Sequence, residues 1–183
     1  RVDFSNDTAT MLARGPLSLG RKYSPGAGNA DYGYFGGGGS TMVSTVDRID
    51  YSSDTSTLTV KGPLSLATGT TGATGNLSYG YWGAGYNPSS PSPRSSVDRI
   101  DYSNDTPTTP TKGPLSLARY NLSATSSSSN ALRQYSLTIS TPFAFGNNPT
   151  TSYPYGYYGD GNNYTTLVER IDYANDNNAP SRR

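Results

Sequence analysis

Hydrophobic and polar side chains alternate residue by residue in several stretches of this chain, which predicts β-strands. Within 46–51, Ile49 and Tyr51 fall on one face of the predicted strand, and Arg48 and Asp50 fall on the other. Short stretches of Thr, Val and Leu continue this alternation. No stretch combines helical periodicity with capping residues, so we expect an all-β fold with almost no helix.

Residues with turn chemistry separate these stretches into a series of four short strands. We expect strands at 46–51, at 55–60, from Leu64 onwards, and at 77–82. Turns are expected at 52–54 and 61–63, and a variable loop at 68–76. Each unit is therefore expected to begin with the strand at 46–51 and to end with a strand that stops at glycines. Two turns and a loop separate its four strands.

Three landmarks recur in a fixed order, which makes the chain a tandem repeat. The first is VDRIDYSSDT at 46–55, with further copies at 1–8, 97–106 and 168–177. The second is Gly-Pro-Leu-Ser-Leu, which starts at Gly15, Gly62 and Gly113. The third is a Gly-Tyr-aromatic-Gly box at 33–36, 80–83 and 156–159.

The landmarks divide the chain into three repeats and part of a fourth. Repeat 1 covers 1–45, repeat 2 covers 46–96, repeat 3 covers 97–167 with an insertion at 120–154, and 168–183 is the first strand of a fourth repeat with a tail. Four strands in about 50 residues match the size of a β-propeller blade. We therefore expect propeller-like blades, with a threefold β-prism or trefoil, or an intermolecular β assembly, as alternatives.

The landmarks resemble those of two kinds of repeat protein. Gly36-Gly37, Tyr51 and Pro63-Leu64 occupy places comparable to those of a kelch repeat, although the tryptophan usual after the Asp-Thr turn is missing. The segments VDRIDYSNDT, GPLSLA and YGYFGGG resemble more closely the tandem arrays in proteins of marine tailed phages, particularly those that infect cyanobacteria. This resemblance covers nearly the whole chain and implies a virion or extracellular protein.

Composition excludes several classes of function. The chain has no Cys and no His, which rules out disulfides, Cys/His zinc sites and His-based acid–base catalysis. Its 14 basic and 13 acidic residues nearly cancel, so no nucleic-acid footprint is present. The apolar runs are too short to insert into a membrane. Because the chain lacks an initiator Met and starts inside a repeat, we expect a processed or longer parent chain.

The recurring acids have a structural interpretation. The pairs Asp50/Asp54, Asp101/Asp105 and Asp172/Asp176 could suggest a Ca²⁺ site, but the spacing of an EF-type loop is absent. We expect the second Asp of each pair to cap its turn and the first to pair with an Arg. If the units stack, the Arg of one unit can bridge an Asp of the next. Repetition in every unit argues against catalysis, so we predict no enzyme activity, no catalytic residue, no metal and no cofactor.

The aromatic residues are the candidates for recognition. The chain has 16 Tyr and one Trp, set among Ser, Gly and Asn, a chemistry that resembles antibody paratopes. Those that we expect to contact a partner are Tyr81, Trp82, Tyr86, Tyr135, Tyr157 and Tyr158. Alternate members of each box should instead lie in the core, because a strand exposes every second side chain.

The sequence thus predicts a structural or interaction protein of a phage virion: a fibre, a tail-associated part or a capsid-surface component. It would display Tyr-rich loops for contact with the host surface or with other subunits. Expected partners are virion proteins, copies of the chain itself, and a cell-surface glycan. The alternative is a secreted bacterial adhesin or carbohydrate-binding module.

Overall fold

The computed structural model describes residues 1, 5, 8, 10–69, 71–126, 155–159, 167–179 and 181–182, and these form three antiparallel four-stranded sheets. Sheet 1 contains β1 (Gly26–Gly28), β2 (Tyr32–Gly36), β3 (Val46–Asp50) and β4 (Thr59–Lys61). Sheet 2 contains β5 (Gly72–Gly75), β6 (Tyr79–Gly83), β7 (Val97–Asp101) and β8 (Thr111–Lys112). Sheet 3 contains β9 (Ser123–Ser126), β10 (Tyr155–Gly159), β11 (Val168–Asp172) and β12 (Ser181–Arg182).

The strands of each sheet are hydrogen-bonded in chain order, and the same landmarks occupy the same places. The Gly-Tyr box is always the second strand, and the VDRID segment is always the third. The register is conserved as well, because Tyr34 lies opposite Arg48, Tyr81 opposite Arg99, and Tyr157 opposite Arg170. The prediction of an all-β chain with almost no helix is confirmed for the described residues.

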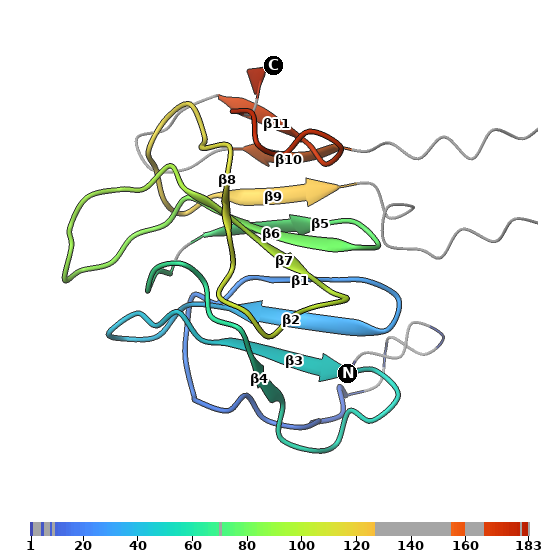
Figure 1. Ribbon diagram of the computed structural model, residues 1–183. Helices are drawn as coiled ribbons and strands as arrows, with labels where there is room; N and C mark the ends of the chain where they lie inside the picture. The colour runs from blue at the N-terminus through green and yellow to red at the C-terminus, as the bar shows by residue number, and fades with distance from the viewer. Residues whose placement is uncertain are drawn as a thin grey trace, which may run out of the picture.

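The sheets lie one above another, with sheet 1 at the bottom and sheet 3 at the top of Figure 1. Their first strands are neighbours, since β5 packs beside both β1 and β9. Over the described residues the three sheets form an open stack. Closure into a propeller therefore stays a prediction.

Two hydrophobic cores fill the spaces between the sheets. The core between sheets 1 and 2 consists of Tyr34, Val46, Leu64, Trp82, Ile100 and Tyr102. The core between sheets 2 and 3 consists of Tyr81, Ala84, Val97, Leu115, Leu122, Tyr158, Ile171 and Tyr173. Each sheet thus uses both faces: Ile and Tyr of the VDRID copy face the preceding sheet, and Val faces the following one.

Glycines in the boxes let the aromatic rings of one sheet approach the backbone of the next. A Cβ built on Gly36 would lie 2.7 Å from the indole nitrogen of Trp82, and one on Gly83 would lie 2.7 Å from the ring of Tyr158. Any larger residue would push the sheets apart at these points. The prediction that these glycines admit close sheet packing is confirmed.

The predicted strands within a unit were wrong in four respects. The VDRID strand is the third of its sheet, so each sheet joins the end of one sequence repeat to the start of the next. The copy at 168–177 accordingly supplies the third strand of sheet 3, where we expected the opening strand of a new unit. The expected loop at 68–76 contains β5, a four-residue strand.

The fourth error concerns the segment that begins at Leu64, which is not a strand. Leu64 is 2% exposed because it enters the core between sheets 1 and 2, whereas the next side chain, Ser65, binds a carboxylate of sheet 2. Leucine and serine alternate here because neighbouring side chains of one loop make different contacts. Alternation in the sequence does not by itself distinguish such a loop from a paired strand.

Candidate functional site

In sheets 2 and 3, one carboxylate accepts three donors from the sheet before it. The hydroxyl of Tyr34 donates to Oδ2 of Asp105 at 2.9 Å, and Nη1 of Arg48 contacts the same oxygen at 2.9 Å. Nζ of Lys61 lies 3.1 Å from Oδ1. The donors come from β2, β3 and β4 of sheet 1, and Asp105 lies in the turn after β7 of sheet 2. We call this arrangement the inter-sheet carboxylate.

The same arrangement joins sheet 2 to sheet 3. The hydroxyl of Tyr81 donates to Asp176 at 2.9 Å, and Nη1 of Arg99 contacts it at 2.7 Å. Nζ of Lys112 lies 3.4 Å from the second carboxylate oxygen. The sequence repeat is therefore also a repeat of inter-sheet contacts, because each set of three donors binds a carboxylate of the following sheet.

The first residues of the chain reproduce part of this arrangement on the other side of sheet 1. Asp54, the equivalent of Asp105, receives Nη1 of Arg1 at 3.3 Å and Nε of Arg14 at 3.4 Å. Arg1 and Arg14 occupy the sequence positions of Arg48 and Lys61 in the repeat. The backbone N–H of Leu12 donates to the carbonyl of Arg1, as in a strand pair.

A second carboxylate in each sheet binds the Gly-Pro-Leu-Ser-Leu loop. Ser65 donates its N–H and its hydroxyl to Asp98 at 2.9 Å and 2.7 Å, and Ser18 binds Asp47 in the same way. In sheet 3 the residue is Glu169, which accepts the N–H of Ser116. Burial raises the pKa of Asp98 above its ordinary value, against the lowering effect of the Ser65 hydrogen bonds.

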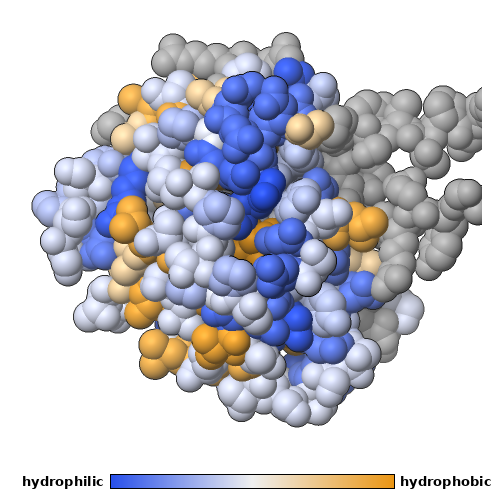
Figure 2. Space-filling model, in the orientation of Figure 1, coloured by the Kyte–Doolittle hydropathy of each residue, from blue (hydrophilic) through white to orange (hydrophobic). Residues whose placement is uncertain are grey.

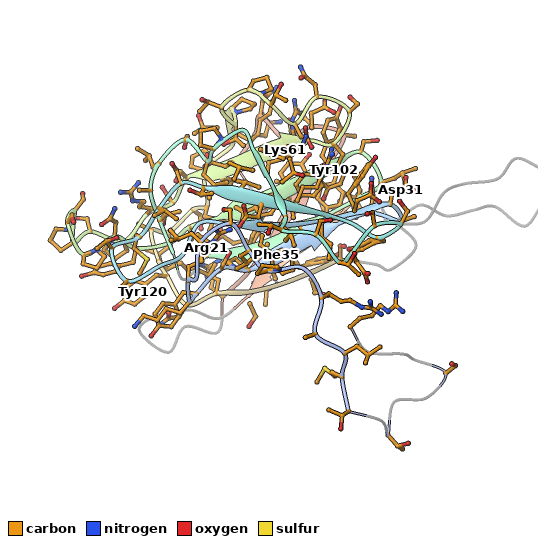
Figure 3. All side chains as sticks on the ribbon, turned by 90° about the horizontal axis from the view of Figure 1, so that it is seen from below. Arg21, Asp31, Phe35, Lys61, Tyr102 and Tyr120 are labelled. Carbon is orange, nitrogen blue, oxygen red and sulfur yellow. The ribbon has the colours of Figure 1, made fainter. Side chains whose placement is uncertain are left out.

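In sheets 1 and 3 this buried acid also forms an ion pair with an arginine. Arg21 lies 2.9 Å from Asp47, and both side chains are fully buried. Figure 3 shows Arg21 close to Phe35, whose carbonyl accepts a 3.0 Å hydrogen bond from its guanidinium. Arg119 pairs with Glu169 at 2.5 Å in the same buried setting. These pairs fix the loop against the sheet.

The roles of the paired acids are the reverse of the prediction. Asp50 and Asp101, the first of each pair, cap the turn by accepting the N–H and hydroxyl of the serine two residues later. The hydrogen bonds from Ser52 lower the pKa of Asp50. The second acid carries the ion pair to the arginine. The expectation that an Arg of one unit bridges an Asp of the next is confirmed, but with the second Asp of the pair.

Tyrosine rings accompany each inter-sheet carboxylate. Tyr34 stacks on Tyr102 with centroids 4.8 Å apart, and Tyr81 stacks on Tyr173 at 5.0 Å. Burial, together with the nearby Asp105, raises the pKa of Tyr34 far above its usual range, and burial with Asp176 does the same for Tyr81. Both hydroxyls therefore remain protonated donors over the ordinary range of pH.

The structure divides the predicted recognition residues between core and surface. Tyr81, Trp82 and Tyr158 are at most 2% exposed and lie between sheets, where their rings contact protein. Tyr86 is half-buried and packs on Tyr120 with centroids 5.1 Å apart. Tyr157 is partly exposed on sheet 3. Tyr135 lies outside the described residues, as does most of the predicted insertion at 120–154.

Two surface hollows lie beside aromatic residues. One, of about 420 Å³, lies between sheets 1 and 2 and is lined by Tyr32, Tyr79, Tyr102, Asp31 and Asp101, among others. Another, of about 450 Å³, is lined by Tyr23, Pro25, Thr71, Asn121 and Leu122, with Ser24. On the side of the molecule shown in Figure 2, hydrophobic residues form separate patches between polar ones.

Sequence reasoning missed the part played by Tyr34, Asp105 and Asp176. One signal was available in the sequence. The spacing from Arg48 to Lys61 is the same as that from Arg99 to Lys112, so the arginine and the lysine keep the same positions relative to the turn between them in both repeats. Among the described residues, no group of three or more acidic side chains is placed to hold a metal ion. None of these residues belongs to a helix that could cross a membrane.

No protein-family model matches the chain, and the search of curated proteins found no match.

Proposed function

We propose that this chain is a structural repeat protein of a phage virion, which stacks sheets through inter-sheet carboxylates and presents tyrosines for contact with other subunits or with the host surface. The observation that carries the proposal is the repeated contact of Tyr34, Arg48 and Lys61 with Asp105. Between sheets 1 and 2, and again between sheets 2 and 3, the recurring charged residues join one sheet to the next. This use supports a mechanical role over a chemical one.

The acids offer little to catalysis. A general acid or base needs a carboxyl group with a free path to a substrate. Asp105 and Asp176 are instead held by a tyrosine and two cations each, and Asp47, Asp98 and Glu169 are held by serines of the loops. The same environment recurs from sheet to sheet, which supports the proposal that the chain is not an enzyme.

The stack is compatible with propeller-like blades. In a propeller the innermost strands of successive four-stranded blades lie next to one another around a central axis. Here β5 packs beside β1 and β9, and in sheets 1 and 3 the later strands lie progressively further from β5 (Figure 1). We therefore propose that the three sheets are consecutive blades, in preference to a threefold prism or trefoil.

The virion assignment is tested by mass spectrometry of purified particles from a phage whose genome encodes this chain. We expect its peptides at a constant ratio to a known structural protein through successive density-gradient fractions. Peptides found only in the soluble lysate, and never in the particles, would overturn the assignment. A soluble hydrolytic activity that disappears on loss of one carboxylate would overturn the non-enzymatic part.

The hollow between sheets 1 and 2 favours a second candidate function, a carbohydrate-binding module or adhesin. Its walls combine the aromatic rings of Tyr32 and Tyr79 with the acids Asp31 and Asp101, a mixture that suits sugar hydroxyls and sugar faces. A glycan array with the purified chain tests this candidate. Saturable binding that is lost in Tyr79→Ala would support it, and a blank array would exclude a lectin role for the glycans displayed.

A further inference from the structure

The outer face of sheet 3 carries the same donors that join the other sheets. Tyr157 and Arg170 lie opposite each other in β10 and β11, in the register of Tyr34 with Arg48. The guanidinium of Arg170 lies 4.1 Å from the ring centroid of Tyr155, and that of Arg48 lies 4.4 Å from Tyr32. The arginine is therefore already oriented by its neighbouring ring.

This face differs from its two counterparts in exposure. Tyr157 is 36% exposed, whereas Tyr34 and Tyr81 are at most 1% exposed. Val168 is 37% exposed, whereas the equivalent valines of sheets 1 and 2 are fully buried. Among the described residues no carboxylate pairs with Arg170, whereas Arg48 pairs with Asp105 and Arg99 pairs with Asp176. The face thus has the chemistry of an inter-sheet contact without the sheet that would complete it.

The opposite end of the stack presents the complementary half. Tyr51 is the sheet 1 equivalent of Tyr102, which stacks on Tyr34 and is 8% exposed; Tyr51 itself is 49% exposed. Its hydroxyl lies over Gly28 and Gly33, as that of Tyr102 lies over Gly75 and Gly80. One side of the Tyr51 ring is therefore positioned by its own sheet, and the other is available for stacking.

The described cation contacts of Asp54 at this end are long. Its donors Arg1 and Arg14 lie at 3.3 and 3.4 Å, longer than the 2.9 Å contacts of Tyr34 and Arg48 with Asp105. No tyrosine hydroxyl of the described residues donates to it. The side chain of Arg1 is 57% exposed, so its contact can be replaced at little cost.

We propose that sheet 3 of one chain binds sheet 1 of a second copy, head to tail. Tyr157 stacks on Tyr51 of the second copy, and the hydroxyl of Tyr157 and the guanidinium of Arg170 bind its Asp54, where they take the place of Arg1. The proposal deepens the proposed function by naming its partner, and it rests on the two contacts that the chain already makes within itself. The two surfaces differ, so the contact is heterologous.

Sedimentation velocity of the full chain over a range of concentrations tests the pairing. We expect the average mass of the wild type to rise with concentration. Tyr157→Ala and Tyr51→Ala should each weaken association about tenfold or more, because each removes an aromatic pair. Tyr23→Ala is the matched control, since Tyr23 is an exposed tyrosine whose ring contacts Lys22. Its association should equal that of the wild type.

An equimolar mixture of the Tyr157→Ala and Tyr51→Ala chains separates a specific interface from general damage. The first retains a complete sheet 1 face and the second a complete sheet 3 face, so the mixture should associate although neither chain does alone. Arg170→Ala provides an independent weakening on the same face, and thermal unfolding of each variant checks that it is folded.

A wild type that stays monomeric at every concentration would overturn the proposal, as would variants that associate normally or a mixture that does not recover. A monomeric chain that is nevertheless present in purified particles would overturn this pairing and leave the virion assignment standing. If the chain associates but is absent from purified particles, the virion assignment is overturned and this pairing stands.

Discussion

The hydroxyl of Tyr34 donates a 2.9 Å hydrogen bond to Asp105, a residue of the next sheet that lies 71 positions later in the chain. The same contact joins Tyr81 to Asp176. Each carboxylate also contacts two cations, and its tyrosine stacks on a tyrosine of the next sheet, so one carboxylate joins three strands of one sheet to the sheet that follows.

Loss of the Asp105 carboxylate should destabilise the fold far more than loss of its neighbour Asp101. In Asp105→Ala, Arg48 and Lys61 lose their shared counter-charge and the Tyr34 hydroxyl loses its acceptor, so we expect a loss of about 3 kcal/mol in the free energy of unfolding. Asp101→Ala removes a turn cap and should cost about 1 kcal/mol. Urea unfolding of both variants measures the difference; equal losses would contradict the role assigned to Asp105.

Gly62 should not tolerate alanine. A Cβ at this position would lie 1.9 Å from the carbonyl oxygen of Pro107, where the loop of one unit crosses the turn of the next. We expect Gly62→Ala to lower the free energy of unfolding by about 2 kcal/mol or more, because the backbone must move. Gly20→Ala is the control, since a Cβ there meets nothing within 4 Å. A Gly62→Ala chain as stable as the Gly20→Ala chain would refute the close crossing.

Alkaline pH should unfold the protein through its buried tyrosines. Burial raises the pKa of Tyr34, Tyr81 and Tyr158 above the ordinary value of about 10. The unfolded chain then releases these protons before the folded one, so stability is fully present below about pH 10 and falls as the pH rises above it. The tyrosinate absorbance of these buried rings should therefore appear only together with the change in circular dichroism. A rise in tyrosinate absorbance to completion with native circular dichroism would argue against burial of these rings.

Asp98 and Asp50 should contribute to pH dependence with opposite signs. Burial raises the pKa of Asp98, so its contribution to stability is greatest below its ordinary pKa of about 4 and falls as the pH rises through the raised value. Hydrogen bonds from Ser52 lower the pKa of Asp50, so its contribution is present above its ordinary pKa and is lost as the pH falls through the lowered value. The measurement is the stability difference between wild type and Asp98→Asn, and between wild type and Asp50→Asn, across acidic pH. Two differences that change in the same direction as the pH falls would contradict the assignment.

Part of the candidate site could be predicted from the sequence, and the reason lies in its local geometry. Alternation along 46–51 correctly separates Ile49 from Arg48, because the faces of a strand depend only on the backbone. The glycines of the boxes also indicate close packing. The exchange of roles between Asp50 and Asp54 was not predictable, since the two acids flank the same turn and either could cap it.

The sequence by itself determined the all-β class, the landmarks that recur from unit to unit, and the two faces of the VDRID strand, because these follow from backbone geometry and from repetition. Only the tertiary structure decided which strands share a sheet and which residues meet across sheets. Tyr34 and Asp105 are far apart along the chain, and their contact exists because two whole sheets stack at a distance set by glycines such as Gly36. The same stacking leaves Tyr157 and Arg170 on an outer face, in the positions that the inner sheets use to bind a carboxylate.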